Sequence, residues 1–255
     1  MCQLLGMNSF KPARLDFSLA GFLRRGGETD EHADGWGAAC FTDRGCELLI
    51  DEGASATSVA AEHFQREHCP VRNVLVHIRK ATQGAVSRQN CHPFVRQLWG
   101  RDWAFAHNGN LERDKLAVPQ LFQPAGETDS EQAFCLICDA LVQHFGAEAP
   151  THEALHALLS ETADRIAQAG TFNFMLSNGE ILFARCATEL HYVQRAWPFG
   201  RARLLDCERE IEFAQYNNLD DRMIIVATRP LTDEAWQAIP QGRLMAFMQG
   251  QMLAI

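Results

Sequence analysis

The chain has 255 residues, of which 47% are hydrophobic and 22% charged, and its formal net charge is -9. This apolar fraction is typical of a globular protein and excludes disordered, coiled-coil and collagen-like chains. The acidic balance argues against nucleic acid as a partner, because contacts to phosphate need clustered Lys and Arg. No stretch approaches the roughly 18 consecutive apolar residues of a membrane span, so no membrane partner is expected either.

The N-terminal segment and the cysteine content predict a cytoplasmic protein. A secretory signal begins with basic residues followed by an apolar run, whereas here the apolar start gives way at once to Asn8, Ser9 and Lys11. Without such a signal, the expected compartment is the reducing cytoplasm. The nine cysteines are therefore expected to be thiols, and their odd number would leave one over even after full pairing.

The first half of the chain is expected to mix short strands with helices. A turn at 43–45 joins two of the strands, and Ser55 or Thr57 is expected to cap the second helix. The last strand is expected to end at His107-Asn108-Gly109. The expected strands are 1–8, 35–42, 46–51, 74–78 and 103–106, and the expected helices are 16–25 and 55–68.

The second half is expected to hold two helices followed by strands. A helix over 130–145 has an apolar face at helical spacing and can be capped by Thr128 or Asp129. A second helix ends near Ile166, and Asn178-Gly179 predicts a hairpin because both turn positions need positive φ. The strands expected after the helices are 172–176, 181–184, 190–193, 211–213, 223–228 and 243–248.

This order of elements favours antiparallel sheets layered with helices over a doubly wound parallel sheet. No Gly-rich phosphate loop follows a strand, so nucleotide binding has no support. No linker rich in Pro, Gly or Ser divides the chain. We therefore expect an α+β fold in a single domain.

Cys2 can carry nucleophilic chemistry if Met1 is removed, as is usual before a small residue. Its α-amine would then have a pKa of about 7.7–8.0 and could act as the general base for its own thiol. This is the N-terminal-nucleophile arrangement. The alternative is a small buried hydrophobic residue at the start of a strand, and position alone favours that alternative.

Three further segments suit an amino-acid substrate, and each also has a purely structural interpretation. Arg79 follows the buried strand 74–78 and offers a bidentate fork for a carboxylate, or it forms a structural ion pair. Asn108 and Gly109 offer an amide donor and a close backbone N–H that suit an oxyanion hole, or they form an ordinary turn. Asp129 suits a substrate ammonium, or it caps the following helix.

The order and spacing of these segments are more specific than any one of them. The blocks are Cys2, Gly35-Trp36-Gly37, His77-x-Arg79-x-Ala81-Thr82, His107-Asn108-Gly109 and Thr128-Asp129-Ser130-Glu131. Together they resemble the class II glutamine amidotransferase domain, an N-terminal nucleophile hydrolase. A closer resemblance, over essentially the whole chain, is to the stand-alone bacterial members of the YafJ type. Its motifs are Met1-Cys2-x-Leu4-Leu5-Gly6-Met7, His32-x-Asp34-Gly35-Trp36-Gly37 and Gly126-Glu127-Thr128-Asp129-Ser130-Glu131.

The resemblance implies a four-layer α/β/β/α sandwich with two mainly antiparallel sheets. It implies one glutaminase domain over residues 1–255, without an acceptor or synthetase domain. It assigns Cys2 as the nucleophile, and Asn108 with the backbone of Gly109 as the oxyanion hole. Arg79 would hold the substrate α-carboxylate, and Asp129 would hold the α-ammonium. The further residues that it places at the substrate are Thr82, Gly35, Trp36 and, in the segment Asn90-x-His92-Pro93, His92.

The implied reaction is hydrolysis of the γ-amide of glutamine or of a γ-glutamyl compound through a γ-glutamyl thioester. It releases glutamate and ammonia or an amine, and it needs no cofactor or metal. Two alternatives stay open: a glutaminase subunit that supplies ammonia to a separate synthase partner, and a catalytically silent glutamine-binding regulatory protein. A homodimer is a further open alternative for its assembly. Lys80 and Gln83 depart from the synthetase-linked members, which usually carry Trp or Tyr and often His there.

Two other patterns point to packing rather than chemistry. Cys135 and Cys138 have the CxxC spacing, but they lie inside an amphipathic helix, so neither redox nor zinc use is expected. His152 and His156 are four residues apart on another helix, but no third ligand accompanies them. No metal site is therefore expected.

Overall fold

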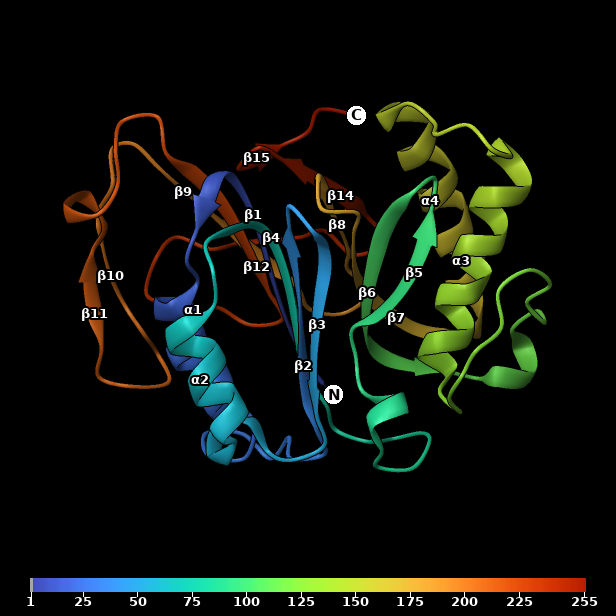
Figure 1. The fold of residues 1–255 in the computed structure, drawn as a ribbon, viewed down its shortest axis with the longest axis horizontal. Coiled ribbons are helices and arrows are strands. Elements are labelled where there is room, and N and C mark those ends of the chain that lie inside the picture. The colour runs from blue at the N-terminus through green and yellow to red at the C-terminus, as the bar shows by residue number, and fades with distance from the viewer. Residues whose placement is uncertain (1) are drawn as a thin grey trace.

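The structure, a computed structural model, describes residues 2–255, so Met1 and its expected removal lie outside it. Two antiparallel sheets lie face to face, and helices cover the outer side of each sheet (Figure 1). The layers are therefore helix, sheet, sheet and helix. The expected α+β class with two antiparallel sheets is confirmed.

Seven strands form the first sheet, in the spatial order β13-β9-β12-β1-β4-β2-β3. The first strand, β1, lies inside this sheet, antiparallel to β12 on one side and to β4 on the other. The bounds are β1 (Gln3–Ala13), β2 (Trp36–Thr42), β3 (Gly45–Asp51), β4 (Val71–Ile78), β9 (His191–Ala196), β12 (Arg222–Ala227) and β13 (Gln237–Ala238).

Six strands form the second sheet, in the order β15-β14-β8-β7-β6-β5. A separate two-stranded ribbon, β10 (Arg201–Arg203) with β11 (Glu210–Glu212), lies at the left margin of Figure 1. The bounds in the second sheet are β5 (Phe94–Leu98), β6 (Arg101–Leu111), β7 (Gly170–Ser177), β8 (Ile181–Arg185), β14 (Leu244–Met248) and β15 (Gln251–Met252).

Three apolar clusters hold the four layers together. Helices α1 (Asp16–Phe22) and α2 (Val59–Glu67) pack on the first sheet through residues such as Phe22 and Phe64. Helices α3 (Asp129–Phe145) and α4 (His152–Ile166) pack on the second sheet. Between the sheets lie Leu4, Ala39, Leu75, Ala104, Ala106, Met175, Leu182, Ala184, Ile224 and Val226, among others. Each fully buried large side chain stabilises the fold by roughly 1.5–3 kcal/mol.

Strand β4 shows why its sequence is almost continuously apolar. Val74, Val76 and Ile78 belong to the cluster under the helices, whereas Leu75 belongs to the cluster between the sheets. Because side chains alternate along a strand, His77 also faces the second sheet. Both faces of β4 are therefore buried, as the sequence predicts.

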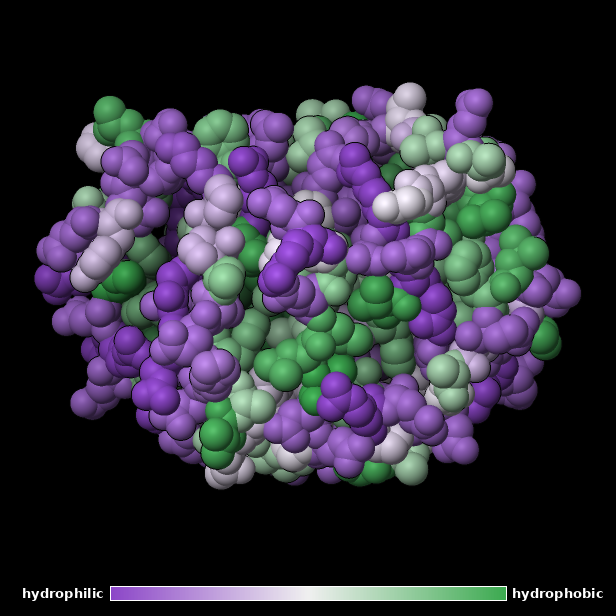
Figure 2. Space-filling model, in the orientation of Figure 1, coloured by the Kyte–Doolittle hydropathy of each residue, from purple (hydrophilic) through white to green (hydrophobic). Residues whose placement is uncertain are grey.

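Most charged residues of this acidic chain lie on the outside, with exceptions such as Arg79 and Asp129. Figure 2 shows a mostly hydrophilic face, with hydrophobic residues near its centre and over the helices at the right. Within residues 2–255, no helix is long and apolar enough to cross a membrane.

Expectations about β6, β1 and α2 need correction, and strand β5 was not expected at all. Strand β6 does not stop before His107 but continues to Leu111, and it pairs with β7 along this stretch. Asn108-Gly109 is therefore not a turn. Strand β1 extends beyond the expected 1–8, to Ala13. Strand β5 is not predicted by the sequence pattern.

The third correction concerns the start of α2. Ser55 and Thr57 lie in a short 3-10 turn, and Ser58 caps the helix by accepting a hydrogen bond from Ala61 N at 3.1 Å. Ser55 lies three residues before this cap, and its hydroxyl donates to Leu23 O at 2.6 Å. The contact with Leu23 holds residues 55–57 in a separate turn, so the helix begins later than the sequence predicts.

Candidate active site

Three segments meet beside Cys2 at one edge of the first sheet. Gln3 of β1 pairs with Ile78 of β4, which in turn pairs with Trp36 of β2. Beyond these pairs, the Arg79 N–H donates to Gly35 O at 2.8 Å. The antiparallel register thus brings Cys2, Arg79 and Gly35 to one place, although they are far apart in the sequence.

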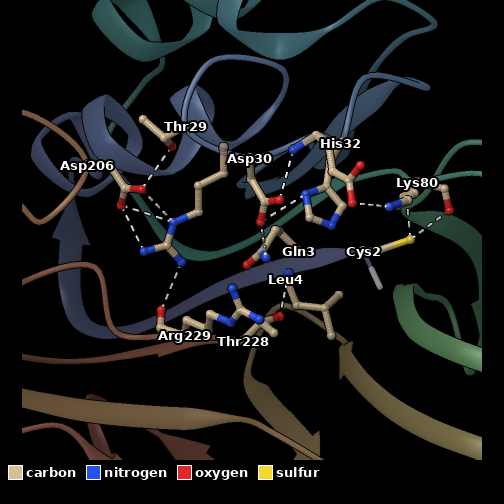
Figure 3. A network of polar contacts seen from close by, with 12 residues as sticks. Cys2, Gln3, Leu4, Thr29, Asp30, His32, Lys80, Asp206, Thr228 and Arg229 are labelled. Carbon is tan, nitrogen blue, oxygen red and sulfur yellow. Dashed lines mark hydrogen bonds and ion pairs between the residues drawn. The ribbon is translucent and has the colours of Figure 1, made fainter.

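The Cys2 thiol lies against the backbone of Lys80. Its Sγ is 3.4 Å from Lys80 O and accepts a hydrogen bond from Lys80 N at 3.3 Å (Figure 3). The ammonium of Lys80 forms an ion pair with Glu31 at 2.5 Å. The same close-up shows Gln3 and His32 meeting at Asp30. The residues before β2 and after β4 are thereby linked around the thiol.

Burial raises the pKa of the Cys2 thiol, and the charge of Asp129 adds to this effect. The Lys80 backbone hydrogen bond and the charge of Arg79 lower it. Burial likewise raises the pKa of Cys40 and of Cys46 to about 12. The direction of the pKa shift therefore does not single out Cys2. Cys2 is distinguished instead by its place at the sheet edge, where the strand register brings Arg79 and Gly35 beside it.

The Arg79 guanidinium organises the loop that follows β4. It is 3% exposed and donates to the carbonyl oxygens of Gln83 at 3.0 Å, Gly84 at 3.2 Å and Ala85 at 3.1 Å. Thr82 lies exposed in this loop. A structural ion pair, the alternative for Arg79, is not found among the described residues.

Gln83 ties this loop to the second sheet. Its Nε2 donates to Asn110 Oδ1 at 2.7 Å and to Leu111 O at 2.9 Å, at the end of β6. The loop therefore runs from the end of β4, next to Cys2, to the end of β6. The sequence marks Gln83 only as a departure from related chains and does not predict this bridge.

Asn108 and Gly109 lie on β6 opposite Asn173 and Phe172 of β7. The Asn108 side chain is 1% exposed, and its Oδ1 has no hydrogen-bond partner among the described residues. Leaving a buried polar group unpaired costs about 1–3 kcal/mol, so this acceptor oxygen is a candidate to receive a proton donor of a ligand. The oxyanion hole that the sequence predicts would use the Nδ2 donor of the same amide. Asn173 Nδ2 donates to Asn108 O at 2.8 Å and so holds the backbone at this point.

Asp129 is the first residue of α3, and its carboxylate is 4% exposed. Thr128 caps the helix by accepting a hydrogen bond from Glu131 N at 3.2 Å, so the capping role that was one alternative for Asp129 falls to its neighbour. Asp129 Oδ2 instead accepts a hydrogen bond from Leu111 N at 2.8 Å. The carboxylate is thereby tied to the end of β6, near Asn108 and Gly109.

Two further residues expected at the substrate are buried in packing contacts. The Trp36 indole is fully buried and packs on Phe64 of α2, with ring centroids 6.1 Å apart. His92 lies between His77 and Phe94, with ring centroids 4.2 and 4.7 Å away. Its Nδ1 accepts a hydrogen bond from His107 N at 3.3 Å. His92 thus joins the loop to β6.

Among residues 2–255, no cluster of His, Cys, Asp and Glu side chains has the arrangement of a metal site. Acid groups around the thiol are instead engaged by backbone donors: Ala81 N donates to Asp34 Oδ2 at 2.8 Å, and Glu31 N donates to Asp30 Oδ1 at 2.8 Å. The arrangement offers a thiol, a cation and a carboxylate suited to an amino-acid substrate.

Comparison with known proteins decides the family. The family model described as "Glutamine amidotransferases class-II" matches residues 1–255. The chain belongs to the class II glutamine amidotransferases. It is 43% identical over 255 residues to a protein of Haemophilus influenzae named "Putative glutamine amidotransferase", covering 100% of this chain and 86% of that protein.

Other members of the class II glutamine amidotransferases support the resemblance to the YafJ type. The chain is 40% identical over 252 residues to "Putative glutamine amidotransferase YafJ" of Escherichia coli, covering 98% of this chain and 99% of that protein. The crystal structure of a "predicted glutamine amidotransferase from Pseudomonas aeruginosa PA01" is 35% identical and covers 100% of both chains, with a TM-score of 0.76. The expected family and its N-terminal-nucleophile hydrolase fold are confirmed.

Proposed function

We propose that this class II glutamine amidotransferase hydrolyses the γ-amide of glutamine or of a γ-glutamyl compound, with Cys2 as its nucleophile. One observation carries the proposal: the strand register places the Cys2 thiol at a sheet edge with Arg79, and the loop after Arg79 reaches the end of β6, where Leu111 N donates to the Asp129 carboxylate. A cation and an anion near one thiol match the α-carboxylate and α-ammonium of an amino acid. With both α-groups bound in this way, the γ-amide at the end of the side chain is free to react with the Cys2 sulfur.

Loss of Met1 supplies the base in this proposal. Because burial raises the pKa of the Cys2 thiol, the thiol is neutral before reaction and must give up its proton. The free α-amine of Cys2, with a pKa of about 8, is suited to accept it. The Lys80 N–H, 3.3 Å from Sγ, then stabilises the thiolate.

The thiolate attacks the γ-carbonyl carbon, a C–S bond forms, and the carbonyl electron pair moves to oxygen. The Asn108 side-chain amide and the Gly109 N–H stabilise this oxyanion. When the C–N bond breaks, the Cys2 α-ammonium gives its proton to the departing nitrogen. Water then adds to the thioester carbonyl, and cleavage of the C–S bond releases glutamate and the free thiol.

Substrate selectivity rests on the two charged groups. Arg79 has five N–H donors, and the described loop carbonyls accept one bond from Nη1 and two from Nη2. In this proposal the same guanidinium also holds the α-carboxylate. Asp129 accepts the α-ammonium. Thr82 and the backbone of Gly35 border the substrate, and the buried His92 and Trp36 support the site from behind.

The proposal extends to the whole chain. The family match covers residues 1–255, which supports treating them as one glutaminase domain, and we place its activity in the cytoplasm. A synthase partner or a second copy of the chain would change where the ammonia goes but not how the amide is cleaved.

The test is a glutamate-release assay on glutamine and a series of γ-glutamyl compounds. We expect the wild-type protein to release glutamate from at least one of them, and Cys2→Ala to abolish turnover while leaving the fold intact. The matched control is Cys69→Ala, which removes an exposed thiol elsewhere and keeps full activity. A folded Cys2→Ala protein with undiminished turnover would refute the mechanism.

The intact mass of the purified protein tests the base. We expect a mass that lacks Met1, since only then is the α-amine of Cys2 free. Retention of Met1, together with absence of glutamate release, would favour the silent glutamine-binding protein. Release only after a synthase is added would favour the subunit that supplies ammonia to a partner.

A further inference from the structure

His107 occupies a position between the two parts of the proposed site that bind different ends of the substrate. It is 1% exposed and immediately precedes Asn108 on β6. Its Nδ1 lies 2.8 Å from Ser130 Oγ on α3, and its Nε2 lies 3.1 Å from Thr171 O on β7. One imidazole ring therefore connects three elements at the site.

The partners of this ring decide which nitrogen carries the proton. A carbonyl oxygen can only accept, so the nitrogen facing Thr171 O must be Nε2–H. Burial lowers the pKa of His107, so the ring is neutral and its Nδ1 holds only a lone pair. The Ser130 hydroxyl must then donate its hydrogen to His107 Nδ1.

This assignment determines what Asp129 can do. Ser130 Oγ also lies 3.5 Å from Asp129 Oδ1, but a hydroxyl has one hydrogen, and His107 takes it. The other oxygen, Asp129 Oδ2, already accepts from Leu111 N. Asp129 Oδ1 can therefore accept a hydrogen bond from an N–H group of a ligand.

The same ring limits the space beneath the proposed oxyanion hole. A Cβ added to Gly109 would lie 2.6 Å from His107 Nε2 and 1.9 Å from Thr171 O. Both distances are far below van der Waals contact, so position 109 has no room for a side chain. The Gly109 backbone therefore packs directly against the His107 ring and the Thr171 carbonyl, which are hydrogen-bonded to each other.

We propose that His107, as the neutral Nε2–H tautomer, is a positioning residue that holds the Ser130 hydroxyl away from Asp129 and sets Asn108-Gly109 relative to it. This inference rests on the proposed function, because the group that Asp129 accepts is the α-ammonium of the substrate. Without the His107 acceptor, the Ser130 hydroxyl would turn to Asp129 Oδ1 and compete with that ammonium.

The test measures binding of glutamine and of γ-glutamylglycine by calorimetry, in the Cys2→Ala protein so that no turnover intervenes. Gln at position 107 keeps a donor for Thr171 O but loses the Nδ1 acceptor, so we expect His107→Gln to weaken binding about tenfold, the size of one charge-assisted hydrogen bond. Adding Ser130→Ala removes the competing hydroxyl and is expected to restore most of the affinity. A structural defect would instead grow worse with the second substitution.

Glutaramate, which is glutamine without the α-amine, is the matched ligand control. Its affinity should change little in His107→Gln, because it has no ammonium to compete with Ser130. An unchanged glutamine affinity in His107→Gln, or a double variant that binds no better than the single one, would overturn the proposal. So would nitrogen NMR that places the His107 proton on Nδ1.

The outcomes separate this inference from the proposed function. If glutamine binds and the substitutions behave as expected, but the wild-type protein releases no glutamate, the positioning role stands and the hydrolase proposal fails. If glutamate is released and the substitutions have no effect on affinity, the reverse holds. Failure of both ligands to bind would overturn both.

Discussion

At the scale of single residues, two asparagines paired across β6 and β7 differ in how far the fold engages their side chains. Asn108 illustrates this, because its side-chain oxygen is buried without a partner among the described residues, whereas the neighbouring Asn173 is fully engaged. Asn173 Oδ1 accepts from Ala187 N at 2.7 Å and from Thr188 N at 2.9 Å. Two asparagines paired across adjacent strands thus have opposite roles.

The first prediction concerns the oxyanion hole. Asn108→Asp keeps the shape of the side chain but replaces the donor with a negative charge, so we expect kcat to fall by about 10²–10³, with a smaller change in KM. Steady-state kinetics of glutamate release measure both constants. The control is Asn178→Asp, because Asn178 uses only its Oδ1, accepting from Glu180 N at 3.0 Å, which Asp can replace. Equal losses in the two variants would contradict the assignment.

At the scale of elements, two neighbouring residues at the start of α3 have different tasks: Thr128 caps the helix, and Asp129 belongs to the proposed site. Thr128 satisfies the free N–H of Glu131, and this leaves the carboxylate of Asp129 to bind the end of β6. Further along the same helix, Asp139 accepts from Leu121 N at 3.1 Å and Phe122 N at 2.9 Å. Helix α3 therefore anchors the segment that leads back to its own N-terminus.

The second prediction compares two helix caps. Thr128→Ala is expected to lower the free energy of unfolding by about 1 kcal/mol and to raise KM several-fold, because Asp129 shifts with the frayed first turn. Thr151→Ala removes the equivalent cap of α4, whose Oγ1 accepts from Ala154 N at 3.3 Å. It should cost similar stability without altering KM. Urea unfolding and steady-state kinetics measure the two effects, and matching KM values would argue against a role for Asp129.

At the scale of the whole molecule, the two sheets enclose three histidines next to the site. His77 comes from the first sheet, His107 from the second, and His92 from the loop between them. Burial is the main cause that lowers the pKa of His77 to about 3, and it also lowers the pKa of His92 and His107. The junction of the sheets is therefore built from neutral rings.

These histidines predict loss of stability in acid. The folded pKa of His77, about 3, lies below its ordinary value of 6.5, so the unfolded chain binds more protons between these pH values. The free energy of unfolding should then fall as pH falls through this window. From pH 7.5 to 5, His77 alone should account for about 2 kcal/mol.

The measurement is urea unfolding at the two pH values. His77→Gln, which cannot titrate there, should lose less stability on acidification by that amount. His63→Gln, which changes an exposed histidine on α2, should behave like the wild-type protein. Identical pH dependence in all three would show that folding does not lower the pKa of His77.

Much of the fold and the family could be predicted from the sequence, because local patterns carry that information. The alternation in β4, the apolar face of α3 and the Asn178-Gly179 hairpin between β7 and β8 each depend on neighbouring residues and agree with the structure. The sequence, through its resemblance to the family, also names Cys2, Arg79, Asn108 and Asp129 as site residues, and their roles stay predictions.

Only the tertiary structure decided how these groups are held. The backbone of Lys80 at the thiol, the Gln83 bridge to β6 and the His107–Ser130 contact all join residues from separate elements. The same reason explains why Asn108-Gly109 lies in a strand and why Ser58 caps α2. A hydrogen bond across the fold competes with local preference, and the sequence pattern does not record which one prevails.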